Sequence, residues 1–282
     1  MPLPLPLADL LRFIAEDAPS GDLTSSALAP LGRCRAGIRA KEQGIIAGIG
    51  EASALFSHFG ISVTPALHDG DACRPGSLVM ALEGDAEGIL LVERTALNIL
   101  SRMSGIATAT REMVELAGKV NPAVRIAATR KTCPGMRALD KKAVVIGGGE
   151  AHRATLSDAI LIKDNHLQLV SLGEALRRAL LKAPRDRVEV EVGSLEEAVA
   201  AAGAGAGVIM FDNMDSPAVG DAIRELRARG LRDGVLLEAS GGIGPGNLAE
   251  YARLDLDRIS LGSLTHSIRA LDLSPEVISR ID

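Results

Sequence analysis

The sequence predicts an α/β protein whose C-terminal part is a parallel α/β barrel, preceded by a smaller part of mixed strands and helices. A length of 282 residues with a 47% hydrophobic share is enough for one large or two smaller buried cores. From residue 124 onward, short apolar runs alternate with helical stretches, which is typical of parallel βαβ units. Most of these runs end in charged residues, glycine or serine, as barrel strands do where their ends meet at one mouth.

The elements of the N-terminal part follow from changes in hydrophobic periodicity. Residues 8–16 have helical spacing, and 20–28 predict a turn rich in helix-capping residues. Residues 33–48 alternate apolar and polar side chains as strands do, and 51–60 are helical. Residues 61–83 again predict strands, broken by Asp-Gly and Pro-Gly turns. This pattern predicts an α+β arrangement.

A long helical pattern over 85–118 follows these strands. Ser104 and Gly105 interrupt it, so we expect a helix break with close packing there. The junction between the two parts is placed within this stretch.

The C-terminal part contains helical stretches at 171–182, 194–203 and 216–230. No GxGxxG motif follows its first strand, which disfavours an open dinucleotide-binding sheet and favours a barrel with fewer than eight strands. The strand-like apolar runs cover 124–131, 159–164, 188–192, 207–213, 235–242 and 258–263.

Most of the candidate functional residues lie at the ends of these strands. In a β/α barrel, catalytic groups come from the C-terminal ends of several strands, because those ends converge on one mouth. We therefore expect a mixed-charge pocket at the mouth. Its residues are Arg130 and Lys131, Lys163, Glu191, Asp212, Ser240-Gly241-Gly242, and Gly262-Ser263.

The alternation of side chains along a strand predicts which carboxylates face this pocket. In VEVEV the valines share one face, and Glu189 and Glu191 share the other. On an exposed antiparallel strand the glutamates would form an ordinary solvated face. In a barrel they point inward, where they need cations, hydrogen bonds or a metal. Asp212 is a natural companion, and Glu238 has the parity of Ser240. Such carboxylates can face a ribose or a hydrated Mg²⁺.

Three cationic clusters follow the strands: Arg130-Lys131, His152-Arg153, and Lys163 with His166. A single basic residue at a strand end is usually a surface charge. Three clusters at one rim favour a polyanionic ligand, because Arg matches carboxylate or phosphate with a planar fork and Lys adds a compact charge.

Two glycine-rich segments predict phosphate binding. ASGGIGPGNL and LGSLTHS each place a strand end before a helix start, where backbone N–H groups bind phosphate. Barrels often build that site from their last two strands.

Composition excludes several classes of function. A net charge of −5 with four Phe, one Tyr and no Trp disfavours nucleic-acid binding. No apolar window is long enough to span a bilayer, and the N-terminus lacks the basic region and cleavage site of a signal peptide. Cys34, Cys73 and Cys133 form no CxxC pair, so we expect a soluble protein of the reducing cytoplasm.

The sequence disfavours a zinc site and a catalytic cysteine. His152 and His166 lack the tight spacing of zinc ligands. Cys133 has no identifiable base beside it and is expected to be a small buried cysteine.

Eight segments occur in the order and approximate spacing typical of one enzyme family. They are ERTALNILSRMSGIAT, ATRKTCPGMRALDKKAV, GGGEAHR, LIKDNH, VEVEV, IMFDN, EASGGI and SLGSLTHS. On these, essentially the whole chain resembles the quinolinate phosphoribosyltransferases, also called carboxylating nicotinate-nucleotide pyrophosphorylases, of the type II phosphoribosyltransferase family. TRKT-PG, KDNH and EASGG together are specific to that family.

The resemblance implies an N-terminal α/β sandwich domain and an incomplete parallel α/β barrel of fewer than eight strands. The implied domains are 1–112 with the connecting helix, 113–268 as the barrel, and 269–282 as a segment packing on the N-terminal domain. It also implies a pentosyltransferase of de novo NAD biosynthesis that joins quinolinate to phosphoribosyl pyrophosphate and releases CO₂ and pyrophosphate.

The resemblance assigns roles to residues. The implied catalytic residues are Lys131, Lys163, Glu191 and Asp212, with Mg²⁺ as cofactor held by Glu191 and Asp212, directly or through water. The family forms homodimers, in which Arg94 is donated to the neighbouring subunit, or larger assemblies such as a hexamer of dimers. The implied substrate-binding residues are Arg94, Thr129, Arg130, Lys131, His152, Arg153, Lys163, Glu191, Asp212, Ser240, Gly241, Gly242, Leu261, Gly262 and Ser263.

The chain departs from the family pattern at two places. Gly149-Glu150-Ala151 stands where an Asn or a second His is frequent before His152, and Phe211 replaces the more usual Leu. A paralogous group found with molybdate transport genes usually lacks KDNH, so the intact motif here favours the biosynthetic enzyme. Two other readings stay open: a Schiff-base lyase with Lys163 as nucleophile, and a non-catalytic anion-binding protein.

Overall fold

A computed structural model describes residues 5–281, which form two compact units. The first contains the chain up to Arg111, together with 133–148 and the segment from Ser267. The second contains 112–132 and 149–266. Residues 1–4 and 282, which belong to the predicted domains 1–112 and 269–282, lie outside the described residues. The predicted boundaries at 112 and 268 stay predictions.

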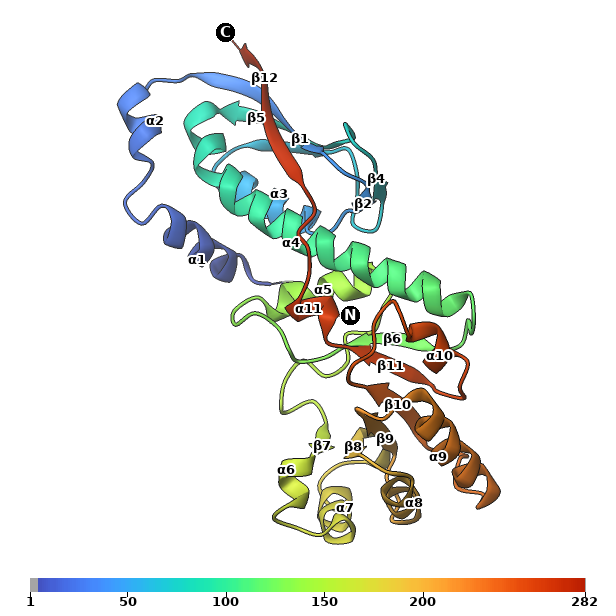
Figure 1. Cartoon of the computed structure of the whole chain (residues 1–282). Helices are drawn as coiled ribbons and strands as arrows, with labels where there is room; N and C mark the ends of the chain where they lie inside the picture. The colour runs from blue at the N-terminus through green and yellow to red at the C-terminus, as the bar shows by residue number, and fades with distance from the viewer. Residues whose placement is uncertain (1–4, 282) are drawn as a thin grey trace. The chain divides into compact units, whose positions relative to one another are not determined.

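The first unit is built on an antiparallel sheet with the order β12-β1-β5-β3. The alternating patterns of 33–48 and 61–83 form strands as predicted. In Figure 1, β12 in red lies beside β1 in blue, because the far end of the chain returns to pair with it. The strands are β1 (Arg33–Ala40), β3 (Ser62–Pro65), β5 (Leu78–Asp85) and β12 (Leu273–Ile281), with a small separate sheet of β2 (Gly44–Ile45) and β4 (Ala72–Cys73).

The helices of this unit include one that the sequence did not predict. The expected turn at 20–28 contains the short helix α2 (Leu23–Leu28). Asp22 caps it by accepting a hydrogen bond from the Thr24 amide at 2.9 Å, so the capping residues start a helix rather than a turn. The others are α1 (Leu7–Asp17), α3 (Ile49–His58), α4 (Ala86–Gly118, which continues into the second unit) and α5 (Arg137–Ile146).

Helix α4 runs unbroken from Ala86 to Gly118, so the predicted interruption at Ser104 and Gly105 was wrong. The predicted close packing is present. A Cβ on Gly105 would overlap the backbone carbonyl oxygen of Arg269 and lie 3.0 Å from the Cα of Ala270. Gly105 therefore serves a close backbone approach, and the helix tolerates it.

The second unit contains a six-stranded parallel sheet in the order β6-β11-β10-β9-β8-β7. Among the described residues β6 and β7 each pair on one side only within this sheet, so the barrel is incomplete, as predicted. The strands are β6 (Arg125–Ala128), β7 (Ile160–Ile162), β8 (Val188–Val192), β9 (Val208–Asp212), β10 (Leu236–Ser240) and β11 (Arg258–Leu261).

Helices cover the outer side of this sheet. Val188, Val190 and Val192 are buried, as the alternation of VEVEV predicted for valines packed under helices. Helix α7 packs on β7 and β8, and α8 packs on β8 and β9 (Figure 1). The helices are α6 (Asp164–Leu167), α7 (Leu172–Leu180), α8 (Leu195–Gly203), α9 (Ser216–Ala228), α10 (Leu248–Ala252) and α11 (Ser263–His266), with the 3₁₀ turn η1 (Arg185–Arg187).

Within residues 5–281, every helix is too short or too polar to cross a bilayer.

The expectation that Cys133 is buried was wrong. Cys133 is exposed, because it lies in the loop between β6 and α5.

Candidate active site

A pocket of about 470 Å³ lies at the C-terminal ends of the parallel strands. Residues from the ends of several strands and from the segments that follow them line it, which is where barrel enzymes place their chemistry. The lining residues are Ala128, Thr129, Arg130, Lys131, His152, Arg153, Leu161, Lys163, Asp164, Asn165, Glu191, Met210, Asp212, Asn213, Ser240, Gly241 and Ser260.

The segment after β6 supplies a fixed cationic wall. The Thr129 hydroxyl oxygen accepts the Lys131 amide at 3.2 Å, and the Lys131 carbonyl oxygen accepts the Thr265 hydroxyl at 2.8 Å. These bonds hold the backbone that presents Arg130 and Lys131. The Nε of Arg130 is buried and makes no hydrogen bond to any described residue. A buried donor of this kind calls for an acceptor from a ligand.

Arg153 adds a second guanidinium to this wall. Burial lowers the pKa of Arg153, and the nearby charge of Arg130 lowers it further. Two guanidinium groups that repel each other in a partly dry pocket are stabilised by an anion placed between them. The cationic wall therefore suits a carboxylate or phosphate ligand.

Strands β8 and β9 each present a carboxylate to the pocket, Glu191 and Asp212. Burial raises the pKa of Glu191, and the charges of Asp212 and Glu189 raise it further, while the contact with the Lys163 ammonium opposes them. Asp212 accepts a hydrogen bond from the Asn213 side-chain amide at 2.9 Å. Two carboxylates that repel each other beside an open pocket can accept a hydrated divalent cation or the hydroxyls of a sugar.

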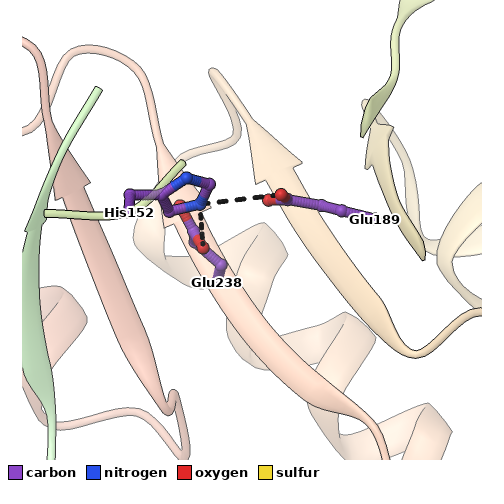
Figure 2. A group of neighbouring side chains, drawn as sticks. All are labelled: His152, Glu189 and Glu238. Atoms are coloured by element: carbon purple, nitrogen blue, oxygen red, sulfur yellow. Dashed lines mark hydrogen bonds and ion pairs between the residues drawn. The ribbon is translucent and has the colours of Figure 1, made fainter. Parts of the chain in front are cut away.

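His152, which lines the pocket, contacts two buried carboxylates. Its Nε2 lies 3.3 Å from Glu238 Oε2 and 3.6 Å from Glu189 Oε2, as Figure 2 shows. Burial lowers the pKa of His152, but the hydrogen bonds and charges of the two glutamates outweigh this and raise the pKa to about 9. Burial likewise opposes ionisation of Glu238, yet hydrogen bonds and charges from His152, Arg258 and Ser260 lower its pKa.

These three side chains lie close enough together to share one ion. However, Arg258 Nη1 already donates to Glu238 Oε2 at 2.9 Å, so this carboxylate is paired with a cation of the protein. We therefore describe His152, Glu189 and Glu238 as an ion-pair cluster.

Comparison with known proteins identifies the family. Residues 22–104 match the model of the quinolinate phosphoribosyl transferase N-terminal domain, and 106–276 match that of the C-terminal domain. The chain belongs to the quinolinate phosphoribosyl transferase family.

Curated members of this family are similar over nearly their whole length. A probable carboxylating nicotinate-nucleotide pyrophosphorylase of Archaeoglobus fulgidus is 48% identical over 263 residues, which cover 92% of this chain and 99% of that protein. The carboxylating nicotinate-nucleotide pyrophosphorylase of Homo sapiens is 36% identical over 280 residues, covering 98% and 93%. The structure of the nicotinate-nucleotide pyrophosphorylase from Francisella tularensis superposes with a TM-score of 0.87 at 33% identity, covering 98% of each chain.

Of the residues implied by the resemblance to quinolinate phosphoribosyl transferases, ten line this pocket. They are Thr129, Arg130, Lys131, His152, Arg153, Lys163, Glu191, Asp212, Ser240 and Gly241.

Five others lie outside the lining. Arg94 is on α4 in the first unit. Leu261 is buried in β11, and Ser263 begins α11. Gly242 follows the lining residue Gly241, and a Cβ on Gly262 would lie 3.3 Å from Cδ of Lys131, which lines the pocket. The phosphate-binding role of these segments remains a prediction.

Sequence reasoning missed several residues that line or support this pocket. Ser260 has the parity of Gly262 at the end of the same strand, a signal that could have found it. Asn213 follows Asp212 with a positive φ of 55°, which the sequence does not reveal. Arg258 is the first residue of β11, far from the strand end where functional residues were expected. Its guanidinium nevertheless donates to Glu238, its neighbour on β10.

Proposed function

We propose that this chain transfers phosphoribosyl from phosphoribosyl pyrophosphate to quinolinate, with loss of CO₂, giving nicotinate mononucleotide and pyrophosphate. The observation that carries the proposal is the pocket itself. It joins the cationic wall of Arg130, Lys131 and Arg153 to the carboxylates Glu191 and Asp212 at the ends of parallel strands. Family membership and the names of the similar proteins support the same reaction.

Quinolinate is a pyridine dicarboxylate, and the cationic wall suits its two carboxylates. Arg130 and Arg153 each offer a planar fork of donors, and Lys131 adds a point charge. The imidazole ring of His152 is held in place by its contacts with the buried carboxylates of Glu189 and Glu238. The lining contains no Phe, Tyr or Trp among its described residues, so charge rather than ring stacking orients the substrate.

The transfer step places positive charge on the sugar. As the ring nitrogen attacks the anomeric carbon and pyrophosphate leaves, the ribosyl group takes on oxocarbenium character. Glu191 and Asp212 are fixed negative groups on the strands opposite the cationic wall, and they stabilise that developing charge without reorganising. The Lys163 ammonium is placed to neutralise the departing pyrophosphate.

Decarboxylation then produces negative charge on the pyridine ring. Loss of the 2-carboxylate leaves an electron pair on the carbon beside the pyridinium nitrogen. The cations that bound the carboxylate, Arg130, Lys131 and Arg153, remain around that carbon and stabilise the pair until it is protonated.

Mg²⁺ fits the residues present. Glu191 and Asp212 would hold it, since Mg²⁺ is usually bound by one or two carboxylates together with substrate phosphates. When bound, it supplies charge neutralisation for a pyrophosphate group. The repulsion that raises the pKa of Glu191 beside Asp212 supports a cation at this place.

We further propose that the protein is a cytoplasmic homodimer, alone or within a hexamer of dimers, in which Arg94 completes the quinolinate site of the neighbouring subunit. This rests on the resemblance of the ERTALNIL segment to the family motif. Mixing Arg94→Ala and Arg130→Ala subunits tests it. Assayed with quinolinate well below its KM, each variant alone is expected to lose at least about 10-fold in activity, and the mixture is expected to regain up to about a quarter of the wild-type activity, because random dimers form one intact site in half of all pairs. A mixture that regains none contradicts the exchange.

The activity is tested by following quinolinate-dependent formation of nicotinate mononucleotide in the presence of Mg²⁺. Absence of product with pure, folded protein would refute the proposal. Two control measurements separate the alternatives: borohydride trapping with a carbonyl substrate would reveal a Schiff base on Lys163, and tight phosphoribosyl pyrophosphate binding without turnover would indicate an anion-binding protein.

A further inference from the structure

Two neighbouring segments of the second unit lead from the sheet into helices beside the pocket. The first, 212–215, runs from the end of β9 to α9, and the second, 240–247, runs from the end of β10 to α10. Their first residues, Asp212 and Ser240, are direct neighbours in strand register, and both line the pocket. The Asn213 amide donates to the Ser240 carbonyl at 2.9 Å, so the two segments are joined where they leave the sheet.

Asn213 fixes one oxygen of the Asp212 carboxylate. Its side-chain amide donates to Asp212 Oδ2 at 2.9 Å. The backbone of Asn213 has a φ of 55°, in the left-handed region that is costly for residues other than glycine, although Asn tolerates it better than most. Such a conformation persists only where the surrounding contacts determine it. The contacts of the next residue, Met214, therefore matter to the placement of Asp212.

Tyr251 on α10 supplies such a contact. Its hydroxyl donates to the Met214 carbonyl at 2.8 Å, and the residue is only 5% exposed. Burial raises the pKa of the Tyr251 hydroxyl, and the charges of Asp215 and Glu250 raise it further, so the group keeps its proton and remains a donor. Tyr251 itself lies outside the pocket lining. Its influence on the pocket therefore passes through the backbone of Met214.

The start of α10 also holds the glycine-rich segment. The Asn247 side chain accepts the Gly244 amide at 2.9 Å and donates to the Gly242 carbonyl at 3.1 Å. The Leu248 amide donates to the Gly244 carbonyl at 2.9 Å. One short helix thus contacts both segments, the one with the candidate phosphate-binding glycines and the one with the candidate magnesium ligand.

A second hydrogen bond joins the first residue of α9 to α10 without contacting this carbonyl. The Ser216 hydroxyl donates to Glu250 Oε2 at 2.9 Å, and this bond is exposed. An exposed hydrogen bond contributes little, because water replaces either partner. The bond from Tyr251 to Met214 is therefore the link that can determine the conformation of 212–215.

We propose that Tyr251 is a positioning residue for the phosphoribosyl pyrophosphate side of the pocket. Its hydroxyl holds the Met214 carbonyl, which keeps the left-handed turn at Asn213, and Asn213 in turn holds the Asp212 carboxylate. This rests on the proposed function, since phosphoribosyl pyrophosphate with Mg²⁺ is the ligand concerned. The cationic wall proposed for quinolinate comes from other segments of the chain, so quinolinate binding should not depend on Tyr251.

The test is Tyr251→Phe, which removes the hydroxyl and keeps the ring. Loss of one neutral hydrogen bond should raise the dissociation constant of phosphoribosyl pyrophosphate with Mg²⁺ by about 3- to 10-fold. Binding is measured by calorimetry in the presence of benzene-1,2-dicarboxylate, which has two adjacent carboxylates like quinolinate but no ring nitrogen to react. The dissociation constant of quinolinate alone should be unchanged, because no contact of the cationic wall is removed.

Two variants serve as matched controls. Thr110→Val also removes a buried hydroxyl, which donates to the Ile106 carbonyl at 2.8 Å in the first unit. It should lose similar stability in urea but keep both dissociation constants. Ser216→Ala removes the exposed bond to Glu250 and should keep them as well. The inference is overturned if Tyr251→Phe binds phosphoribosyl pyrophosphate as wild type does, or if either control weakens that binding equally.

A second measurement follows the turn itself, in protein freed of divalent cations. Hydrogen exchange of the Asn213 amide, resolved by fragmentation mass spectrometry, should be slow in wild type because this amide donates to Ser240. It should become about 3- to 10-fold faster in Tyr251→Phe and stay unchanged in Thr110→Val.

Equal exchange in wild type and Tyr251→Phe would refute the positioning role. Free exchange of the Asn213 amide in wild type would refute it without any variant, in case Tyr251→Phe does not fold. A wild type that makes no nicotinate mononucleotide refutes the proposed function instead, and the exchange comparison still decides whether Tyr251 positions the turn.

Discussion

Replacing Gly241 with alanine should damage the pocket through a defined chain of contacts. Gly241 follows β10 with a φ of 92° and lines the pocket. A Cβ there would overlap the side chain of Asn213 and lie 2.9 Å from its backbone nitrogen. The Asn213 amide N–H donates to the Ser240 carbonyl at 2.9 Å, and its side chain donates to Asp212. Moving Asn213 therefore disturbs the candidate magnesium ligand.

The magnitude follows from two costs and one gain. The left-handed backbone costs alanine roughly 1–2 kcal/mol. Overpacking against backbone costs roughly 1–3 kcal/mol. Loss of glycine's freedom in the unfolded chain returns roughly 0.4–1 kcal/mol. The net loss of stability is thus roughly 1–5 kcal/mol. A displacement of Asp212 by about 1 Å can reduce kcat/KM by about 100-fold.

Two neighbouring glycines separate these effects. Gly242 also has a positive φ, of 64°, but a Cβ on it has nothing within 4 Å, so in the unfolding measurement Gly242→Ala tests the backbone strain alone. A Cβ on Gly244 also meets nothing within 4 Å, and its φ lies outside the left-handed region, so Gly244→Ala should be close to neutral. The assay is urea unfolding by circular dichroism together with kcat/KM for phosphoribosyl pyrophosphate.

The expected order of damage is Gly241→Ala, then Gly242→Ala, then Gly244→Ala. Equal stability and activity of Gly241→Ala and Gly242→Ala would refute the role of the Asn213 contact. A Gly241→Ala enzyme within twofold of wild type in kcat/KM would refute the link to Asp212.

Three further results are expected. Arg130→Ala and Arg153→Ala should each raise the KM for quinolinate by about 10- to 100-fold, the value of one charged hydrogen bond, as measured by initial rates; an unchanged KM would exclude these residues from the quinolinate site. In α4, Gly105→Ala should lower the urea midpoint because its Cβ overlaps the Arg269 carbonyl, although alanine otherwise favours a helix by about 1 kcal/mol. Gly118→Ala, which meets nothing within 4 Å, should be neutral or stabilising, and equal effects at the two sites would contradict the packing argument. Removing divalent cations with a chelator should abolish product formation, and added Mg²⁺ should restore it; activity that persists without divalent cations would contradict the cofactor proposal.

Local pattern predicted most of the fold. Alternation in VEVEV requires the valines to share a face, and helix packing buries that face. Sequence spacing also placed Arg130, Lys163 and Asp212 at or just beyond strand ends, where a parallel sheet gathers them. Both predictions depend only on the two-residue period and the direction of the strands.

Errors arose where local signals compete with packing. A glycine inside a helical pattern usually weakens it, yet α4 continues through Gly105 because another backbone segment needs the space. Capping residues at 20–28 were interpreted as a turn, although Asp22 starts a helix. For Gly105 the deciding contact is with Arg269, far along the chain, whereas the Asp22 cap is a local contact whose signal suits a turn and a helix start equally.

The sequence by itself determined which chemical groups stand at the strand ends: a cationic wall, a pair of carboxylates and glycine-rich segments. Only the tertiary structure decided how they are paired. Glu189 and Glu191 lie on one face, but roughly 6.6 Å apart along the strand, so Glu191 faces the pocket with Lys163 while Glu189 supports His152. Arg258 meets Glu238 through strand register. The alternation of side chains is a property of neighbouring residues in the chain. The register between strands and the burial of a side chain depend on the packing of the whole unit.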